Sequence, residues 1–150
     1  MTEPAKPRRA GIIERIQAET GIDEPMIQQL VHAFYRRVRQ DPLIGPVFAA
    51  RITDWDPHLE RMCAFWSSVV LMSGRYHGAP MPKHAVLPID AAHFDRWLEL
   101  FRTTAREVCP PPAAERFIER AEMIARSLEL GVATTQGVLL DRDQRFRRLA

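Results

Sequence analysis

The sequence is poor in cysteine, and its hydrophobic runs are short. Cys63 and Cys109 are the only cysteines among 150 residues and neither belongs to a Cys-x-x-Cys pair, which excludes a disulfide framework. The longest strongly apolar run, 69–72, is far below the ~20 residues that span a bilayer, and the first residues lack the apolar core of a signal peptide. We therefore expect a soluble cytoplasmic protein that does not act at a membrane.

Signatures of several common protein classes are missing as well. There is no His-Glu-x-x-His zinc motif, no glycine-rich phosphate loop and no Gly-x-Ser-x-Gly elbow. No glutamate precedes a histidine by three residues, as the helical pattern of di-iron bundles requires. The net charge of +2 comes from the two ends, because residues 11–140 hold 14 basic and 16 acidic side chains. A nucleic-acid partner needs a basic face on the folded part, so none is expected.

Apolar residues recur with helical spacing along most of the chain, and no run alternates as a strand does. This pattern predicts an all-α fold with two sequential pairs of long helices. Asp23 is typical of a helix N-cap, with Pro25 in the first turn, and Gly131 is a predicted helix stop. The predicted helices cover about 24–41, 55–72, 91–108 and 113–130. We divide the chain into a loose N-terminal extension, 1–20, one helical domain, 21–131, and a basic C-terminal tail, 132–150.

A long connector, 73–90, separates the two predicted helix pairs. Its two glycines and three prolines leave room for about one helical turn, near 82–87. Connections beyond ~12–15 residues without secondary structure are uncommon in compact domains unless they serve a function. We therefore expect something to hold this connector in place.

Two histidines are candidate functional residues. His84 follows Met-Pro-Lys within the connector, and a neutral imidazole on a short rigid segment is a good axial ligand for haem iron; the alternative is a solvated loop histidine. His58 begins a helical stripe that is otherwise apolar, so it must find a partner or face a cavity, unless it is simply a half-exposed residue at a helix start.

Aromatic residues could complete a ligand pocket around these histidines. Tyr35 and Trp97 each combine a large apolar body with one hydrogen-bond donor. Taken singly, each indicates only core or boundary packing, as does Phe48. Cys63 is interpreted as a small buried side chain rather than an activated thiolate. It is the set of residues that indicates a pocket.

Read together, these segments resemble the group III truncated haemoglobins. The resemblance covers about residues 26–130 in order and with compatible spacing. Its matching stretches are Phe34-Tyr35 with Asp41, Gly45-Pro46-Val47-Phe48, Trp55 with His58, Phe65-Trp66-Ser67-Ser68, Gly74-Arg75-Tyr76-His77-Gly78, Pro80-Met81-Pro82-Lys83-His84, His93-Phe94-Asp95-Arg96-Trp97-Leu98 and Ile124-Ala125-Arg126-Ser127-Leu128.

The resemblance implies a two-over-two helical sandwich around haem b. It makes His84 the proximal iron ligand, Tyr35 and Trp97 the distal donors that face the bound gas, and His58 a residue of the distal gate. The iron–His84 bond and contacts at the haem rim would then order the connector. The remaining implied haem contacts are a stacking Phe48, pocket walls from Met62, Phe65, Trp66 and Phe94, and propionate partners from Arg75, Tyr76 and Lys83.

We therefore expect a haem protein that binds oxygen tightly and also binds nitric oxide and carbon monoxide. Tight retention suits redox chemistry on the bound gas, so nitric oxide dioxygenase or peroxidase activity is a hypothesis. Either activity needs a separate reductase as electron donor, because no reductase domain fits in this chain. The alternative of another class is a haem-free helical interaction or regulatory module that binds a partner through residues 73–90 and the basic tail.

Overall fold

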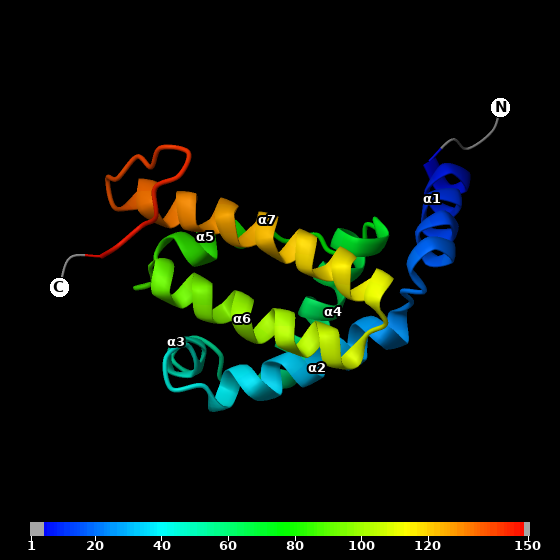
Figure 1. Ribbon diagram of the computed structural model, residues 1–150, viewed down its shortest axis with the longest axis horizontal. Coiled ribbons are helices and arrows are strands. Elements are labelled where there is room, and N and C mark those ends of the chain that lie inside the picture. The colour runs from blue at the N-terminus through cyan, green and yellow to red at the C-terminus, as the bar shows by residue number, and fades with distance from the viewer. Residues whose placement is uncertain (1–4, 149–150) are drawn as a thin grey trace.

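The computed structural model describes residues 5–148, and its regular structure over that range is entirely α-helical (Figure 1). The all-α fold expected from the periodicity is therefore confirmed. The helices are α1 (Ala5–Thr20), α2 (Glu24–Gln40), α3 (Gly45–Ala49), α4 (Trp55–Leu71), α5 (Pro80–Ala85), α6 (Ala91–Val108) and α7 (Pro111–Thr135).

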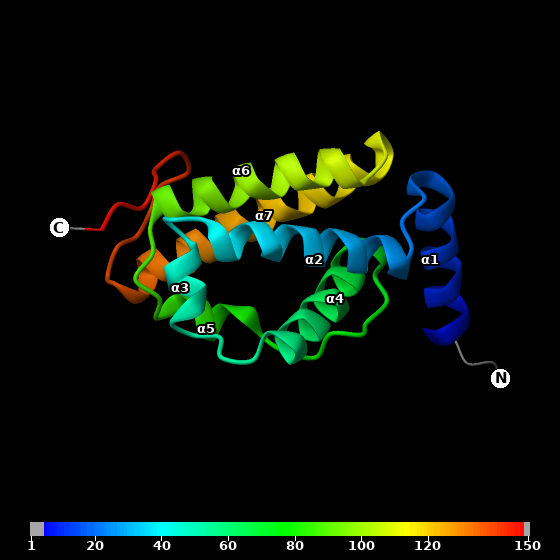
Figure 2. The ribbon, with the colours of Figure 1, turned by 90° about the horizontal axis from the view of Figure 1, so that it is seen from below.

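The four long helices after α1 pack as two pairs. α2 lies on α4, while α6 and α7 run antiparallel, since only two residues connect them (Figures 1 and 2). The pairs contact each other through α2 with α6 and through α4 with α7. This arrangement is the two-over-two sandwich that the resemblance implied. The short helices α3 and α5 close one side of it (Figure 2).

Local signals fix where the long helices begin. The Asp23 side chain accepts from the backbone N–H of Met26 at 2.9 Å, as expected of an N-cap. Asp90 caps α6 by accepting from the N–H of Ala92 at 3.1 Å, and His93 Nδ1 accepts from the N–H of Asp90 at 3.1 Å. These reciprocal bonds form a capping box, which holds the segment that follows α5 against the first turn of α6.

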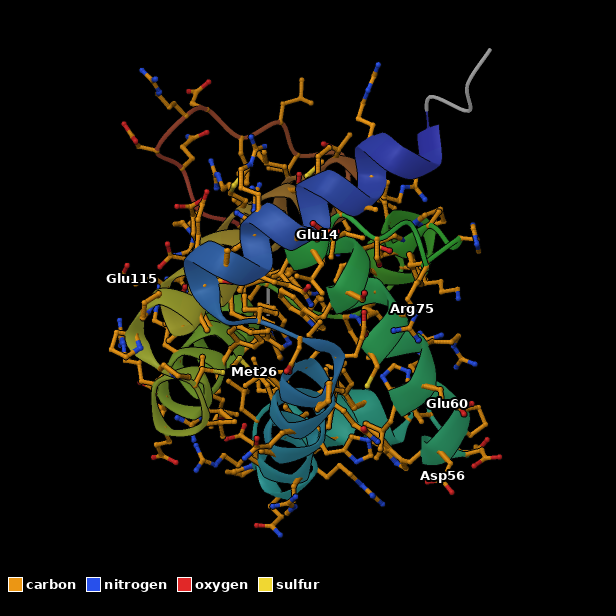
Figure 3. All side chains as sticks on the ribbon, turned by 90° about the vertical axis from the view of Figure 1, so that its right-hand side faces the viewer. Glu14, Met26, Asp56, Glu60, Arg75 and Glu115 are labelled. Atoms are coloured by element: carbon orange, nitrogen blue, oxygen red, sulfur yellow. The ribbon has the colours of Figure 1, made fainter. Side chains whose placement is uncertain are left out.

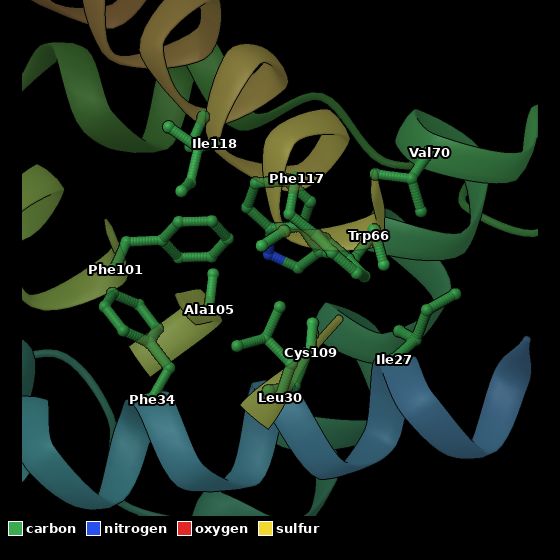
Figure 4. Packing of buried hydrophobic residues seen from close by; sticks show 14 of the residues in the cluster. Ile27, Leu30, Phe34, Trp66, Val70, Phe101, Ala105, Cys109, Phe117 and Ile118 are labelled. Atoms are coloured by element: carbon green, nitrogen blue, oxygen red, sulfur yellow. The ribbon is translucent and has the colours of Figure 1, made fainter. Parts of the chain in front are cut away.

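The main core lies where the two helix pairs meet (Figure 4). The Trp66 ring of α4 stacks on Phe101 of α6, with 4.9 Å between the centroids, and Phe101 also packs against Phe34 of α2 at 5.1 Å. Such aromatic pairs add roughly 0.5–1.5 kcal/mol beyond the area they bury. The core therefore fixes the relative position of α2, α4 and α6, the three helices that carry Tyr35, His58 and Trp97.

Two predictions about local structure are corrected. Helix α7 continues through Gly131 to Thr135, because Gly131 is a packing site rather than a stop. A Cβ at Gly131 would lie 2.1 Å from Sδ of Met81, so the missing side chain lets α5 approach α7. Residues Ala5–Thr20, predicted to be loose, form α1, whose buried Ile16 packs into the main core.

The connector is held by hydrogen bonds at its first residues. The buried Ser67 hydroxyl bonds to Glu24 and to the hydroxyl of Ser73, both at 2.6 Å. The backbone N–H of Tyr76 donates to the Ser68 hydroxyl at 2.8 Å. These bonds attach residues 73–76 to α4. Contacts within the protein therefore order this part of the connector, in addition to the expected contacts with the haem rim.

The residues after α7 are not helical but fold back over the bundle (Figure 1). Phe146 is buried among residues that are otherwise exposed. None of the helices over residues 5–148 combines the length and hydropathy needed to cross a bilayer.

Candidate functional site

An apolar cavity of about 500 Å³ lies inside the bundle, and every helix from α2 to α7 contributes to its wall. This volume and lining are typical of a small-molecule or cofactor site. The lining residues are Tyr35, Ile44, Val47, Phe48, Arg51, Ile52, His58, Arg61, Met62, Phe65, Trp66, Tyr76, Pro80, Lys83, His84, Val86, Leu87, Ile89, His93, Phe94, Trp97, Ile124 and Leu128.

His84 reaches this cavity from α5, where its ring is held by the helix itself. Its Nδ1 lies 2.7 Å from the carbonyl oxygen of Pro80, one turn earlier. Since a carbonyl only accepts, Nδ1 carries the proton and donates, which leaves Nε2 unprotonated in the neutral ring. This is the tautomer that a histidine needs to bind a metal through Nε2.

Tyr35 of α2 and His58 of α4 line one corner of the cavity, and the Trp55 ring packs against both. The rings of Tyr35 and His58 are 5.3 Å apart, and Trp55 lies 5.9 Å from Tyr35 and 5.5 Å from His58. The Arg39 guanidinium stands 4.6 Å above Trp55 in a cation–π contact. Phe48 of α3 packs edge-on against Tyr35 at 5.8 Å. These contacts hold both polar rings in place from several sides.

The polar atoms of this corner are not bonded to other residues. His58 Nε2 is buried and has no hydrogen-bond partner within the described part of the chain. A buried polar atom without a partner costs free energy, so its persistence indicates that a ligand completes the site. The Tyr35 hydroxyl likewise makes no hydrogen bond to residues 8–148. Both rings line the cavity, as expected for a polar group on an apolar stripe.

Burial sets the protonation of these groups. It lowers the pKa of His58 from 6.5 to about 4, with the nearby charges of Arg61 and Lys83 acting in the same direction. Burial also raises the pKa of Tyr35 well above its ordinary value, with Cys63 adding to the shift. At neutral pH the cavity therefore contains an uncharged imidazole and a protonated phenol, which can donate a hydrogen bond. Burial raises the pKa of the Cys63 thiol, consistent with an inert side chain.

Trp97 joins the cavity from the opposite helix pair. Its ring stacks on Phe101 with 5.5 Å between centroids and meets Phe34 edge-on at 5.6 Å. Because Phe101 is part of the main core, the indole is fixed along with α6. The structure also places the side chains predicted as pocket walls, Met62, Phe65, Trp66 and Phe94, along the cavity.

The cavity rim is cationic. Lys83 and Tyr76 line it, as expected, and so do Arg51 and Arg61, whereas no lining residue is an aspartate or glutamate. Arg75 does not line it: its guanidinium pairs with Glu24 at the surface near α1 (Figure 3). The expected propionate role of Arg75 thus loses its geometric basis.

Sequence reasoning missed several residues of this site. Arg61 lies three residues after His58 on α4, so helical spacing alone could have placed both on one face. His93 carried a signal as well, since it lies four residues before Trp97 on α6. Arg51 follows α3 in a turn, where no periodicity predicts direction. Trp55 was noted only as part of a matching stretch.

A second hollow, about 680 Å³, lies on the outer side of α6 and α7. Arginines and carboxylates line most of it, and several of them pair with each other, as Arg102 does with Glu122 at 2.7 Å. No histidine or tyrosine contributes to its lining. Its chemistry therefore does not suit a large apolar cofactor, and we place the candidate site in the apolar cavity.

Comparison with known families identifies the fold. The bacterial-like globin family profile matches residues 19–129. The chain belongs to the bacterial-like globins. This truncated haemoglobin is 33% identical over 109 residues to the group 3 truncated haemoglobin ctb of Campylobacter jejuni, a match that covers 69% of this chain and 86% of the relative. It is also 27% identical over 110 residues to the group 2 truncated haemoglobin YjbI of Bacillus subtilis, covering 71% and 83%.

Solved structures agree with this assignment. The crystal structure of the group III truncated haemoglobin from Campylobacter jejuni superposes with a TM-score of 0.68 at 33% identity, over 72% of this chain and 89% of that one. The haemoglobin of Chloroflexus aurantiacus shares the fold, with a TM-score of 0.62 at 24% identity over 75% and 95% of the two chains. The predicted resemblance to group III is thus confirmed. Family membership implies a haem cofactor and the binding of diatomic gases.

Proposed function

We propose that this truncated haemoglobin holds haem b in the apolar cavity, with His84 Nε2 as the proximal iron ligand. The supporting observation is the pairing of two histidines in one cavity. His84 has its Nδ1 directed to a carbonyl, which leaves Nε2 free to ligate, and His58 has a buried nitrogen without a partner. The donor set, the aromatic lining and the cationic rim fit a flat apolar disc that carries two carboxylates.

Haem supplies, when bound, an iron that takes oxygen, nitric oxide or carbon monoxide as a ligand. The protein holds the ring and decides what surrounds that ligand. Phe48, Met62, Phe65, Trp66 and Phe94, which line the cavity, would pack against the bound disc. Lys83 and Tyr76, together with Arg51 and Arg61, would pair with its propionates.

Tyr35 and Trp97 are the hydrogen-bond donors toward the gas, and His58 stands at the distal gate. Burial keeps the Tyr35 phenol protonated, and stacking on Phe101 fixes the Trp97 indole. Hydrogen bonds to charged or strongly polarised acceptors contribute about 1.5–3 kcal/mol each. Two such donors would slow oxygen dissociation by ~100-fold or more, which is the basis for proposing tight retention.

Tight retention favours redox chemistry on the bound gas over delivery. Nitric oxide dioxygenase or peroxidase activity is therefore the enzymatic role we propose, with electrons supplied by a separate reductase. The corner formed by Tyr35 and His58 favours this role, because it presents polar, uncharged groups beside the apolar walls of the cavity. Anaerobic titration of the oxygenated and ferric forms with nitric oxide and hydrogen peroxide distinguishes the two reactions.

The proximal assignment is tested by His84→Gly, with His77→Gly as a matched control. His77 is exposed and lies in the same connector, seven residues earlier. We expect the parent protein and His77→Gly to purify with the same Soret band, and His84→Gly to lose it or to hold haem loosely. Added imidazole should restore the spectrum of His84→Gly, since it replaces the missing ring.

A normal spectrum in His84→Gly would refute this assignment and direct attention to another histidine. The haem-free regulatory module makes a different prediction. In that case the parent protein, expressed with haem available, purifies folded and colourless.

A further inference from the structure

The C-terminal segment 141–148, which we name the strap, lies across the end of the bundle where α6 begins and α7 ends (Figure 1). It was predicted only as a basic tail of open role. Arg126 of α7 donates to three of its backbone carbonyls, those of Asp141, Arg142 and Gln144, at 2.9–3.2 Å. The strap is thus fastened to α7 before its last residues reach α6.

Phe146 is the apolar anchor of the strap. Its side chain is 3% exposed, while its neighbours on both sides are exposed. It belongs to a separate cluster of buried side chains that includes Ile89 and Phe94 and is packed by Leu128. Ile89, Phe94 and Leu128 also line the haem cavity. One side of this wall therefore faces the cavity, and the strap packs behind it.

Arg145 neutralises a buried carboxylate. Glu129 of α7 is 2% exposed, and Arg145 Nε donates to both of its carboxylate oxygens at 3.0 and 3.1 Å. The N–H of Phe146 donates to the same carboxylate at 2.8 Å. A second nitrogen of Arg145 reaches Asp95 of α6 at 2.7 Å. Breaking a buried pair by removing one partner leaves an uncompensated charge, which is strongly unfavourable.

The strap also satisfies the start of α6. The first N–H groups of a helix have no partner within the helix. Here the N–H of Ala91 donates to the carbonyl of Phe146 at 2.8 Å, and the cap residue Asp90 accepts from the N–H of Arg148 at 3.1 Å. Residues 86–90 lead from His84 to this cap. Their C-terminal end therefore joins the first turn of α6, which is hydrogen-bonded to the strap.

We infer that Arg145 and Phe146 are positioning residues for the haem pocket, acting through Ile89, Phe94 and the first turn of α6 on the segment that carries His84. This inference rests on the proposed function, since it assigns the cavity to haem and His84 to the iron. In this view the strap limits haem loss and fixes the orientation of the proximal imidazole. Neither residue touches the cavity itself.

The test compares haem-loaded full-length variants. Phe146→Ala removes the anchor, and Arg145→Gln removes the charge while leaving the anchor. Haem loss is measured as transfer to excess apomyoglobin, and the iron–histidine stretching band of the ferrous form reports the proximal imidazole. We expect haem loss at least about tenfold faster in Phe146→Ala, because truncating a buried Phe is among the most costly core changes. Arg145→Gln should shift both readouts in the same direction, and Phe146→Leu should restore most of the retention.

Two controls separate positioning from general destabilisation. Arg147→Gln removes a neighbouring exposed charge and should change nothing. Ile16→Ala destabilises the main core from α1, far along the chain from the strap, and should lower the urea midpoint without changing the iron–histidine band. If Phe146→Ala and Arg145→Gln leave haem loss and the band as in Arg147→Gln, or behave only as Ile16→Ala does, the inference is wrong. Failure of the proposed function would be seen earlier, as a parent protein without a Soret band.

Discussion

Replacement of Tyr35 by phenylalanine separates ligand retention from stability. The substitution removes one oxygen and keeps the ring, whose edge-on contacts with Phe34, Phe48 and His58 have centroid distances of 5.1–5.8 Å. The hydroxyl has no protein partner within residues 8–148, so no buried acceptor or donor is left behind. Removing a partnerless hydroxyl is neutral or slightly stabilising.

Oxygen retention, unlike stability, should decrease in Tyr35→Phe. Loss of one hydrogen bond to a polarised ligand removes about 1.5–3 kcal/mol, which corresponds to roughly 10–150-fold faster oxygen dissociation. Stopped-flow displacement of oxygen by carbon monoxide measures this rate, and urea unfolding measures stability. Tyr35→Phe should therefore lose oxygen faster while its unfolding midpoint stays the same or rises.

Tyr76→Phe is the matched control, because Tyr76 lies at the rim beside Phe65 and carries the second of the two tyrosine hydroxyls. Because we propose that its hydroxyl pairs with a propionate and not with the gas, Tyr76→Phe should keep the oxygen dissociation rate of the parent even where it holds haem less tightly. An unchanged rate in Tyr35→Phe would refute the distal assignment. A faster rate accompanied by a large loss of stability would instead mean that the hydroxyl serves the fold.

Two further predictions concern packing and pH. Gly131→Ala should lower the free energy of unfolding by about 1 kcal/mol, because the new Cβ would lie 2.1 Å from the Met81 sulfur. In a Met81→Ala background the same substitution should raise the free energy of unfolding, because the better helix propensity of alanine then dominates. Urea denaturation of the four combinations checks this, and destabilisation in both backgrounds would contradict it. The half-buried His58, with its pKa lowered to about 4, stays neutral between pH 6.5 and 4 while the unfolded chain takes up a proton, so stability should fall over that range as pH decreases. The urea midpoint should fall less between pH 7 and pH 5 in His58→Phe than in the parent. An equal fall in the two proteins would contradict the lowered pKa of this ring.

Much of the fold was predictable because its signals are local. The Asp23 cap lies within three residues of the N–H that it accepts, and α6 was predicted to cover the residues it occupies. The single turn of α5 was predicted near 82–87, two residues after its actual bounds of Pro80–Ala85. Helical periodicity placed most of the apolar wall residues on inward faces. Such features depend on residues within about one turn of each other.

The site was only partly predictable. Histidine on a short rigid segment indicated His84, but the bond from its Nδ1 to Pro80 depends on how α5 is built. Arg75 was predicted to lie at the rim, but it pairs with Glu24, a residue of α2 that lies 51 positions earlier in the chain. Gly131 looked like a helix stop because the sequence does not say that Met81 packs against it. In each case the deciding neighbour is distant in sequence.

The sequence by itself determined the four long helices, the Asp23 cap and the side chains that haem chemistry requires, because these follow from residue type and spacing along one element. Tertiary structure alone decided which rings surround His58, which carboxylate Arg145 neutralises, and that a basic tail lies behind the pocket wall. Those outcomes depend on close packing between segments that are far apart in the chain. In such packing the size and position of a single side chain decide which atoms are in contact.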